Sequence, residues 1–435
     1  MLEILIGIGQ SILQVFYSVW WLVLPLFLMF IFWDFWLYYA YVGYARKLKW
    51  VLLEIKVPTG IEKSPKAMEQ VFAAVYQIYS FGIKPVEKYW GGKFREDFMS
   101  FEIVGQSGGV HFYVRCLAGH RNLIESAIYA QYSDAEIVEA QDYRSLWSKV
   151  LPNAVYDVAG TDYQFVKDSA YPIRTYEYFE ESQEEKRLDP IAAMTEVMSR
   201  LQKDEALWVQ IFVRPPAEDN DWKREVQELI DKIIDRKKPA SPPGILGGLF
   251  QFFRNLIVAP TEYPLWPEVE KSREQSSRLL SLTPGERESL EAIEKKMNQI
   301  NFDVNLRFVY IDRRDSFTPL NVSATMSTFN QFNTYNLNSF MPKVKTFTLS
   351  PAGYKGLVGL IAPNVKWIKK KIIWYRKRKL WDAYMKLFWS GGKTMRMSIE
   401  ELATIYHFPS IFAKSPLIRR VPSKKGEPPP GLPVE

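Results

Sequence analysis

The longest apolar stretch of the chain lies at its N-terminus. No side chain from Ile4 to Trp33 carries a charge, and Val15–Trp33 supplies about the twenty apolar residues that a bilayer-spanning helix needs. Pro25 lies inside this stretch and is tolerated there, because neighbouring groups in a membrane helix satisfy the backbone that proline frees. The pattern predicts one transmembrane helix at about residues 15–36, within an anchor that covers residues 1–46.

The residues that flank this helix predict whether it is cleaved off and how it is oriented in the membrane. A secretory signal would carry a positive start and small residues at a cleavage site, whereas Glu3 is the only early charge and bulky aromatic residues follow the apolar run. We therefore expect the helix to be retained. Arg46, Lys47 and Lys49 follow it directly, so the positive-inside rule predicts a single-pass protein of the cell membrane with a cytoplasmic C-terminal body. A buried core helix is the alternative explanation of the same pattern.

A βαββαβ order of elements follows the anchor, over residues 47–150. Ser64 suits the N-cap of the first helix and Pro65 its first position. The predicted strands are 50–57, 98–104, 110–117 and 136–140, and the predicted helices are 64–80 and 121–131. This order is that of the ferredoxin-like arrangement, an antiparallel sheet with two helices on one face, which by itself says little about function.

A second α/β domain is predicted over residues 165–345, as a partial repeat of the first. It begins at Ile173–Phe179, and a Pro- and Gly-rich insertion at about 237–280 interrupts it. The apolar piece Ile245–Val258 within the insertion is short for a bilayer, so it lies in the membrane interface or packs on the domain. The predicted helices are 190–201, 222–236 and 284–299, and the predicted strands are 207–213 and 304–311.

The last part of the chain changes character. A long basic, aromatic helix is expected at about 354–389, within a region that covers 346–397. Its cationic side chains suit the phosphates of nucleic acid or of anionic lipid, and a merely solvated helix face is the alternative. The net charge of +7 favours the same anionic partners. The candidate phosphate or lipid contacts are Lys369, Lys370, Lys371, Arg376, Lys377, Arg378 and Lys379.

The segment 398–435 combines a short helix with a proline-rich tail. Ser398 and Glu401 form the pattern of a capping box, and the helix that they open should end before Pro409. The segment Lys424–Pro433 favours polyproline II geometry, which is usual for a linker or a docking tail. The whole chain is therefore expected to be an α+β protein, with a transmembrane helix, two ferredoxin-like domains, a long basic helix and an extended C-terminal tail.

Residues that could carry chemistry are few and scattered. Cys116 is the only cysteine, and its apolar strand indicates a core position rather than a nucleophile. The three histidines, His111, His120 and His407, show no metal-ligand spacing. The fragment Gly391–Thr394 ends like a phosphate-binding loop but lacks the earlier glycine and the preceding strand. We therefore expect no enzyme activity, no cofactor and no catalytic or metal-binding residue.

Three blocks of sequence resemble a known group of proteins. They are Ile103–Tyr143 with HFYVR and AQYSDAEI, Tyr171–Pro215 with YPIRTYEYFE, LDPIAAMTEVM and ALWVQIFVRP, and Glu401–Pro433 with LATIYHFP, SPLIRR and SKKGEPPPGLP. Together with the anchor, they resemble an uncharacterised family of bacterial membrane proteins related to the N-terminal, pre-ATPase regions of type IV secretion and conjugation-type DNA-translocating ATPases. In longer relatives the last block leads into an ATPase of the FtsK and HerA superfamily, which supplies the Walker motifs.

The resemblance implies the role of an adaptor. Because this chain ends where the ATPase would begin, it implies a separately encoded ATPase that docks on the tail. The leading hypothesis is thus a non-catalytic, membrane-anchored adaptor or scaffold, and the alternative is a membrane scaffold that binds anionic lipid through its basic helix without a DNA role. Nucleic acid and further copies of the chain are the other partners considered. The candidate docking residues are Tyr406, His407, Phe408, Pro409, Arg419, Lys424, Lys425, Glu427, Pro428 and Pro429.

Overall fold

The computed structural model places most of the chain in one α+β body with a long N-terminal helix. It describes residues 2–58, 63–78, 84–93, 98–106, 109–179, 189–216, 219–234, 282–350, 365–389 and 394–409. The expected insertion, the Gly391–Lys393 fragment and the tail beyond Pro409 lie outside these ranges.

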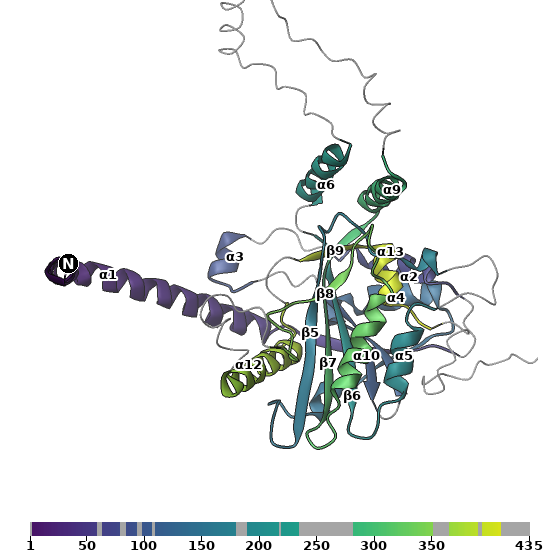
Figure 1. The fold of residues 1–435 in the computed structure, drawn as a ribbon. Coiled ribbons are helices and arrows are strands. Elements are labelled where there is room, and N and C mark those ends of the chain that lie inside the picture. Colours follow the sequence, from purple (N-terminus) through teal and green to yellow (C-terminus); the bar gives the residue numbers. More distant parts are fainter. Residues whose placement is uncertain are drawn as a thin grey trace, which may run out of the picture.

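Helix α1, Leu2–Ala45, projects from the body as a single rod (Figure 1). Its side chains from Trp20 to Phe35 are almost all exposed, whereas several from Trp36 onward are partly covered. Among the described residues, Trp20–Ala45 is the one segment that is long and apolar enough to cross a membrane, a test that a signal sequence would also pass. The predicted N-terminal apolar helix is confirmed.

The body is built on one antiparallel sheet in the order β4-β1-β3-β2-β6-β7-β5-β8, and β9 pairs with β7 beyond this path. The strands are β1 Trp50–Lys56, β2 Met99–Gln106, β3 Gly109–Leu117, β4 Glu136–Glu139, β5 Tyr156–Phe165, β6 Ala206–Arg214, β7 Asn301–Arg313, β8 Phe340–Pro342 and β9 Met395–Ser398. Strand β2 pairs with β6 along its whole length, so both predicted blocks lie in the same sheet.

Helices cover both faces of this sheet. The helices are α2 Lys66–Val75, α3 Pro85–Tyr89, α4 Arg121–Gln131, α5 Ala192–Ser199, α6 Asp219–Ile233, α9 Pro284–Asn298, α10 Pro319–Asn330, α12 Lys366–Met385 and α13 Ile399–Ile405, with 3-10 turns η1 Ala118–His120, η2 Tyr143–Leu146 and η3 Tyr176–Tyr178. Figure 1 shows α12 on one side of the strands and α5 and α10 on the other.

Alternating side chains along the strands divide the core into two hydrophobic clusters, one on each face of the sheet. Phe101 on β2 packs toward α2, α4, α5, α10 and α13, in the larger hydrophobic cluster. Val104 on β2 and Trp208 on β6 face the other side, where they meet Trp381 of α12. Residues of opposite parity on one strand point to opposite faces, so the two clusters follow directly from the pleat.

The structure confirms most of the predicted elements. The first block contains the predicted elements β1, α2, β2, β3, α4 and β4 in that order, with the unpredicted helix α3 between α2 and β2. The capping box of Ser398 and Glu401 opens α13. Two details were wrong. Helix α2 is shorter than expected and has Pro65 at its N-cap, while the hydroxyl of Ser64 accepts the Lys66 N–H at 3.3 Å.

The start of the second block was also wrong. Ile173–Phe179 holds the η3 turn, and the first strand of that block is β5 instead. The sequence of β5 hides this strand because it contains Gly160 and two buried polar residues, Thr161 and Asp162. Asp162 tolerates burial because Arg307 on β7 donates to it at 2.8 Å, a partner that lies far away in the sequence.

Candidate functional site

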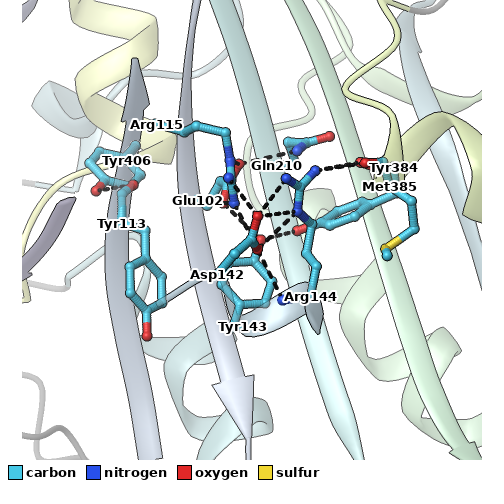
Figure 2. A network of polar contacts seen from close by, with 10 residues as sticks. All are labelled: Glu102, Tyr113, Arg115, Asp142, Tyr143, Arg144, Gln210, Tyr384, Met385 and Tyr406. Carbon is cyan, nitrogen blue, oxygen red and sulfur yellow. Dashed lines mark hydrogen bonds and ion pairs between the residues drawn. The ribbon is translucent and has the colours of Figure 1, made fainter. Parts of the chain in front are cut away.

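A buried polar network lies between the sheet and the C-terminal half of α12 (Figure 2). Three adjacent strands each contribute one polar side chain to the same face: Glu102 from β2, Arg115 from β3 and Gln210 from β6. All three are buried, with Glu102 and Gln210 fully inaccessible to solvent. Such groups are stable in a protein interior only when hydrogen bonds and opposite charges compensate for the lost water.

Arg115 is the centre of the network. Its Nε donates to Glu102 Oε1 at 3.2 Å, and its two terminal nitrogens donate to the Asp142 carboxylate at 2.9 and 3.2 Å. Gln210 Nε2 adds a 3.2 Å hydrogen bond to Glu102 Oε1. The guanidinium therefore joins a strand carboxylate to the loop that follows β4.

The η2 turn connects this network to α12. Tyr143 donates to Glu102 Oε2 at 2.7 Å, and its oxygen lies 2.7 Å from the Tyr384 hydroxyl. Arg144 Nε donates to both Asp142 oxygens at 3.0 Å, and one of its terminal nitrogens donates to the Met385 carbonyl at 2.9 Å. A cation that binds the last carbonyls of a helix also favours the negative end of the helix dipole.

The electrostatics of the network stabilise the charged forms of its acids. Burial by itself raises the pKa of Glu102, but the charges of Arg115 and Arg144 outweigh burial and hold this pKa below its ordinary value. Burial also raises the pKa of Asp142, but hydrogen bonds and charges from the two arginines outweigh it and hold this pKa below its ordinary value. Burial raises the pKa of Tyr143 well above its usual range. The two carboxylates thus stay ionised and paired with the arginines at neutral pH.

The predicted basic residues of α12 separate into two groups. Arg376 is buried and donates to the Phe347 carbonyl at 3.1 Å, while Lys377 lies 2.8 Å from Asp157 on β5. Arg378 pairs with Asp382 one turn further along, at 3.8 Å. The other four are exposed, and no ion-pair partner is found for them among the described residues; they are Lys369, Lys370, Lys371 and Lys379.

The first predicted docking residues lie inside the body. Tyr406 packs against Phe101 with ring centroids 5.0 Å apart. His407 is 2% exposed, with one ring nitrogen 2.8 Å from the Ala403 carbonyl and the other 3.0 Å from Asp189. Phe408 and Pro409 are buried as well. The candidates outside the described residues are Arg419, Lys424, Lys425, Glu427, Pro428 and Pro429.

One family model matches residues 47–418 of this chain, and its description is a domain of unknown function, DUF8128. The chain belongs to the DUF8128 family. No curated protein matches the chain. The DUF8128 region begins directly after α1 and includes every strand of the sheet, α12 and α13. The buried network is therefore a feature of the DUF8128 body.

The cysteine and the two other histidines singled out in the sequence lie on β3 and at the η1 turn of the DUF8128 body. Cys116 is fully buried in β3, and burial raises the pKa of its thiol to about 12. His111 on the same strand lies 2.7 Å from Glu54, while His120 ends the η1 turn before α4. Within the described part of the chain, no group of three His, Cys, Asp or Glu side chains could hold a metal ion.

Sequence reasoning missed a pocket of about 340 Å³ between η3, α9 and the start of α13. Its lining includes Glu177, Glu288, Glu291 and Glu400. Lys295 also lines the pocket and lies 2.6 Å from Glu177 and 2.9 Å from Glu400, so these charges compensate one another in part. In the sequence, this pocket is indicated only by the spacing of Glu288, Glu291 and Lys295, which places them on one face of α9.

Proposed function

We propose that this protein is a non-catalytic, membrane-anchored adaptor for a separately encoded DNA-translocating ATPase. In this proposal α1 spans the cell membrane once, the DUF8128 body lies in the cytoplasm, and the ATPase binds the chain beyond Pro409. Arg46 and Lys47, directly after α1, favour the cytoplasmic side. The three blocks that resemble the pre-ATPase region of conjugation-type translocases suggest the partner.

The observation that carries this proposal is the burial of the segment before Pro409. Glu401 of α13 accepts the backbone N–H of Ile173 at 2.8 Å and forms a buried 2.8 Å ion pair with Lys296. Together with the packing of Tyr406 and Phe408, these contacts hold the C-terminal segment in the core. A partner that binds beyond Pro409 would therefore be held at a defined point of the body, as an adaptor requires.

The strand order supports a finer description of the body. The first block has the order β4-β1-β3-β2, and the second has the order β8-β5-β7-β6 when it is read from the other edge of the sheet. Both orders are those of a ferredoxin-like unit, with one edge of each unit joined through β2 and β6. We propose that the body is a pair of ferredoxin-like domains fused into one sheet, although the fold alone does not indicate a function.

Deletion of residues 410–435 tests the adaptor proposal, because it leaves α13 and the buried Tyr406–Pro409 segment in place. Full-length protein and the deletion variant would be purified from native cells in detergent, and the bound proteins identified. We expect a translocation ATPase with the full chain and its loss with the deletion. Equal recovery from both, or no ATPase with either, would contradict the proposal.

A second candidate function is anionic-lipid binding by the exposed half of α12. Lys369, Lys370 and Lys371 are solvent-exposed, and Trp367 and Trp374 beside them are 66% and 48% exposed. Lysine clusters next to exposed tryptophan are typical of segments that bind an anionic membrane surface. This surface requires no partner protein, so it favours the lipid-scaffold alternative independently of the tail.

One pair of variants separates the two functions. The triple substitution Lys369→Glu, Lys370→Glu and Lys371→Glu should abolish flotation of the body from Lys47 onward with phosphatidylglycerol vesicles, while the full chain with the same changes still recovers the ATPase. Deletion of 410–435 should leave flotation unchanged and abolish recovery of the ATPase. Unchanged flotation of the triple variant would exclude α12 as the lipid contact.

A further inference from the structure

The short helix α3 is fixed to the C-terminal part of α1. Trp36 of α1 donates from its indole nitrogen to the Tyr89 carbonyl at 3.0 Å. The rings of Trp33 and Tyr89 have centroids 6.0 Å apart, and those of Trp36 and Trp90 lie 5.6 Å apart in an edge-to-face arrangement. Four aromatic side chains thus join the two helices, and Figure 1 shows α3 beside α1.

Gly92 brings the chain after α3 closer to α1 than a residue with a side chain could. Its φ angle is +67°, and a Cβ atom at this position would lie 2.1 Å from the backbone carbonyl carbon of Ala40. Only glycine permits both this backbone conformation and this approach. The backbone after α3 therefore touches the backbone of α1 directly.

The contact lies beside Asp34, which is the only charged side chain between Ile4 and Ala45. Asp34 is the first charged side chain after Glu3, and the contacts of α3 extend from Trp33 to Ala40. Seven helical steps of about 1.5 Å correspond to roughly 10 Å along the axis. Headgroups on one side of a bilayer occupy roughly 5–8 Å beyond the hydrocarbon. If Val15–Trp33 crosses the hydrocarbon, α3 is at headgroup depth.

The outward side of α3 has the composition of an interfacial segment. Val86 is 69% exposed and Trp90 is 64% exposed, although both are large apolar side chains. Lys84 and Lys88 are exposed on the same short segment, and the Lys88 ammonium lies 5.4 Å from the centroid of the Tyr89 ring. Tryptophan with lysine is enriched where a protein meets lipid headgroups, because the ring and the aliphatic stem enter the apolar boundary while the charge stays in water.

We propose that α3 and Trp90 enter the headgroup layer of the membrane that α1 spans, and that they hold the DUF8128 body at a fixed depth and tilt. This inference rests on the proposed membrane anchor. The continuity of α3 with α1 selects the bilayer as the occupant of the exposed Val86 and Trp90 surface, and Lys84 and Lys88 complement anionic headgroups.

Spin labels at three positions of the full-length protein test this inference in phosphatidylcholine and phosphatidylglycerol vesicles. The labelled variants are Val86→Cys on α3, Phe27→Cys in the apolar part of α1 and Leu320→Cys at an exposed position of α10. The native Cys116 stays unlabelled because it is fully buried. Collision with oxygen, which concentrates in lipid, is compared with collision with a water-soluble nickel complex.

The expected order of depth is Phe27 deepest, Val86 at the headgroup level and Leu320 in water. If Val86 behaves like Leu320 while Phe27 is deep, the inference about α3 is wrong and the anchor stands. If Phe27 also collides freely with the nickel complex, the anchor and the inference about α3 are both wrong. The three positions therefore distinguish the two failures.

A second variant tests the role of the contact between α3 and α1. Gly92→Ala would place its methyl group in the backbone of Ala40, so the Val86 label should move toward water while the Phe27 label keeps its depth. The matched control is Gly119→Ala, because a Cβ atom there meets nothing within 4 Å. An unchanged depth of the Val86 label in the Gly92→Ala protein would contradict the positioning of α3 by its contact with α1.

Discussion

Replacing Arg115 with methionine tests whether the buried network holds α12 on the sheet. The substitution removes the cation that donates to Glu102 and Asp142 and keeps a side chain of similar length. Glu102 remains fully buried, with the Tyr143 hydroxyl at 2.7 Å and Gln210 at 3.2 Å as its remaining close donors. A buried carboxylate without its nearest cation is the state that costs most in a protein interior.

The magnitude follows from which groups are left unpaired. Breaking a buried ion pair by removing one partner costs about 3–5 kcal/mol of unfolding free energy. Adding Glu102→Gln to Arg115→Met removes the fully buried uncompensated charge. Asp142 keeps Arg144 as its partner, and the imperfectly satisfied neutral groups cost about 1–3 kcal/mol. The double variant should therefore be more stable than the single Arg115→Met variant, although it carries one more change.

Thermal unfolding of the full-length protein in detergent, followed by circular dichroism, measures this difference. In a body of this size, a cost of 3–5 kcal/mol corresponds to a fall in Tm of roughly 5 °C. The control is Arg313→Met, because Arg313 pairs with Asp315 at 3.2 Å on the surface and its loss should leave Tm unchanged. A double variant that is as unstable as Arg115→Met, or more so, would refute the argument that an unpaired buried charge determines the cost.

Three further predictions follow from the same structure. The pKa values of Glu102 and Asp142 are lowered in the folded state, so both acids stabilise the fold fully above the ordinary carboxyl pKa of about 4. This stabilisation is lost as pH falls through their folded pKa values. In acid, Tm should therefore fall more steeply for the natural protein than for the Glu102→Gln, Arg115→Met variant. Ser398→Ala should cost about 1 kcal/mol or more in denaturant unfolding, because the capping box is buried, and more than Thr283→Ala at the exposed box of α9. The thiol of Cys116, whose pKa is raised to about 12, should react with a thiol reagent at pH 8 only after unfolding, and reaction of the native protein would contradict its burial.

Local sequence patterns predicted the elements that form through near neighbours. Trp50–Lys56 is a short run rich in apolar residues, Arg121–Gln131 has helical periodicity, and Ser398 with Glu401 forms a capping box. Each of these signals lies within one element, where hydrophobic period and side-chain capping act over a few residues. The apolar N-terminal helix belongs to the same class, because its length and lack of charge are visible without any partner.

Long-range pairing decided the rest of the fold. Strand β5 escaped prediction because its stability depends on Arg307 and on the neighbouring strand β7, not on its own apolar pattern. The sequences of β2 and β6 likewise do not predict that these two strands pair and join both blocks. An edge strand and a central strand can have the same residue pattern.

The candidate sites show the same division. The sequence by itself determined that α12 is basic and aromatic, but only the tertiary structure decided that Arg376 and Lys377 bind the body while Lys369–Lys371 stay exposed. It also decided that Tyr406 and His407 lie in the core. The physical reason is that charge and hydrophobicity belong to the residue, whereas burial and pairing depend on which distant side chains the sheet brings together.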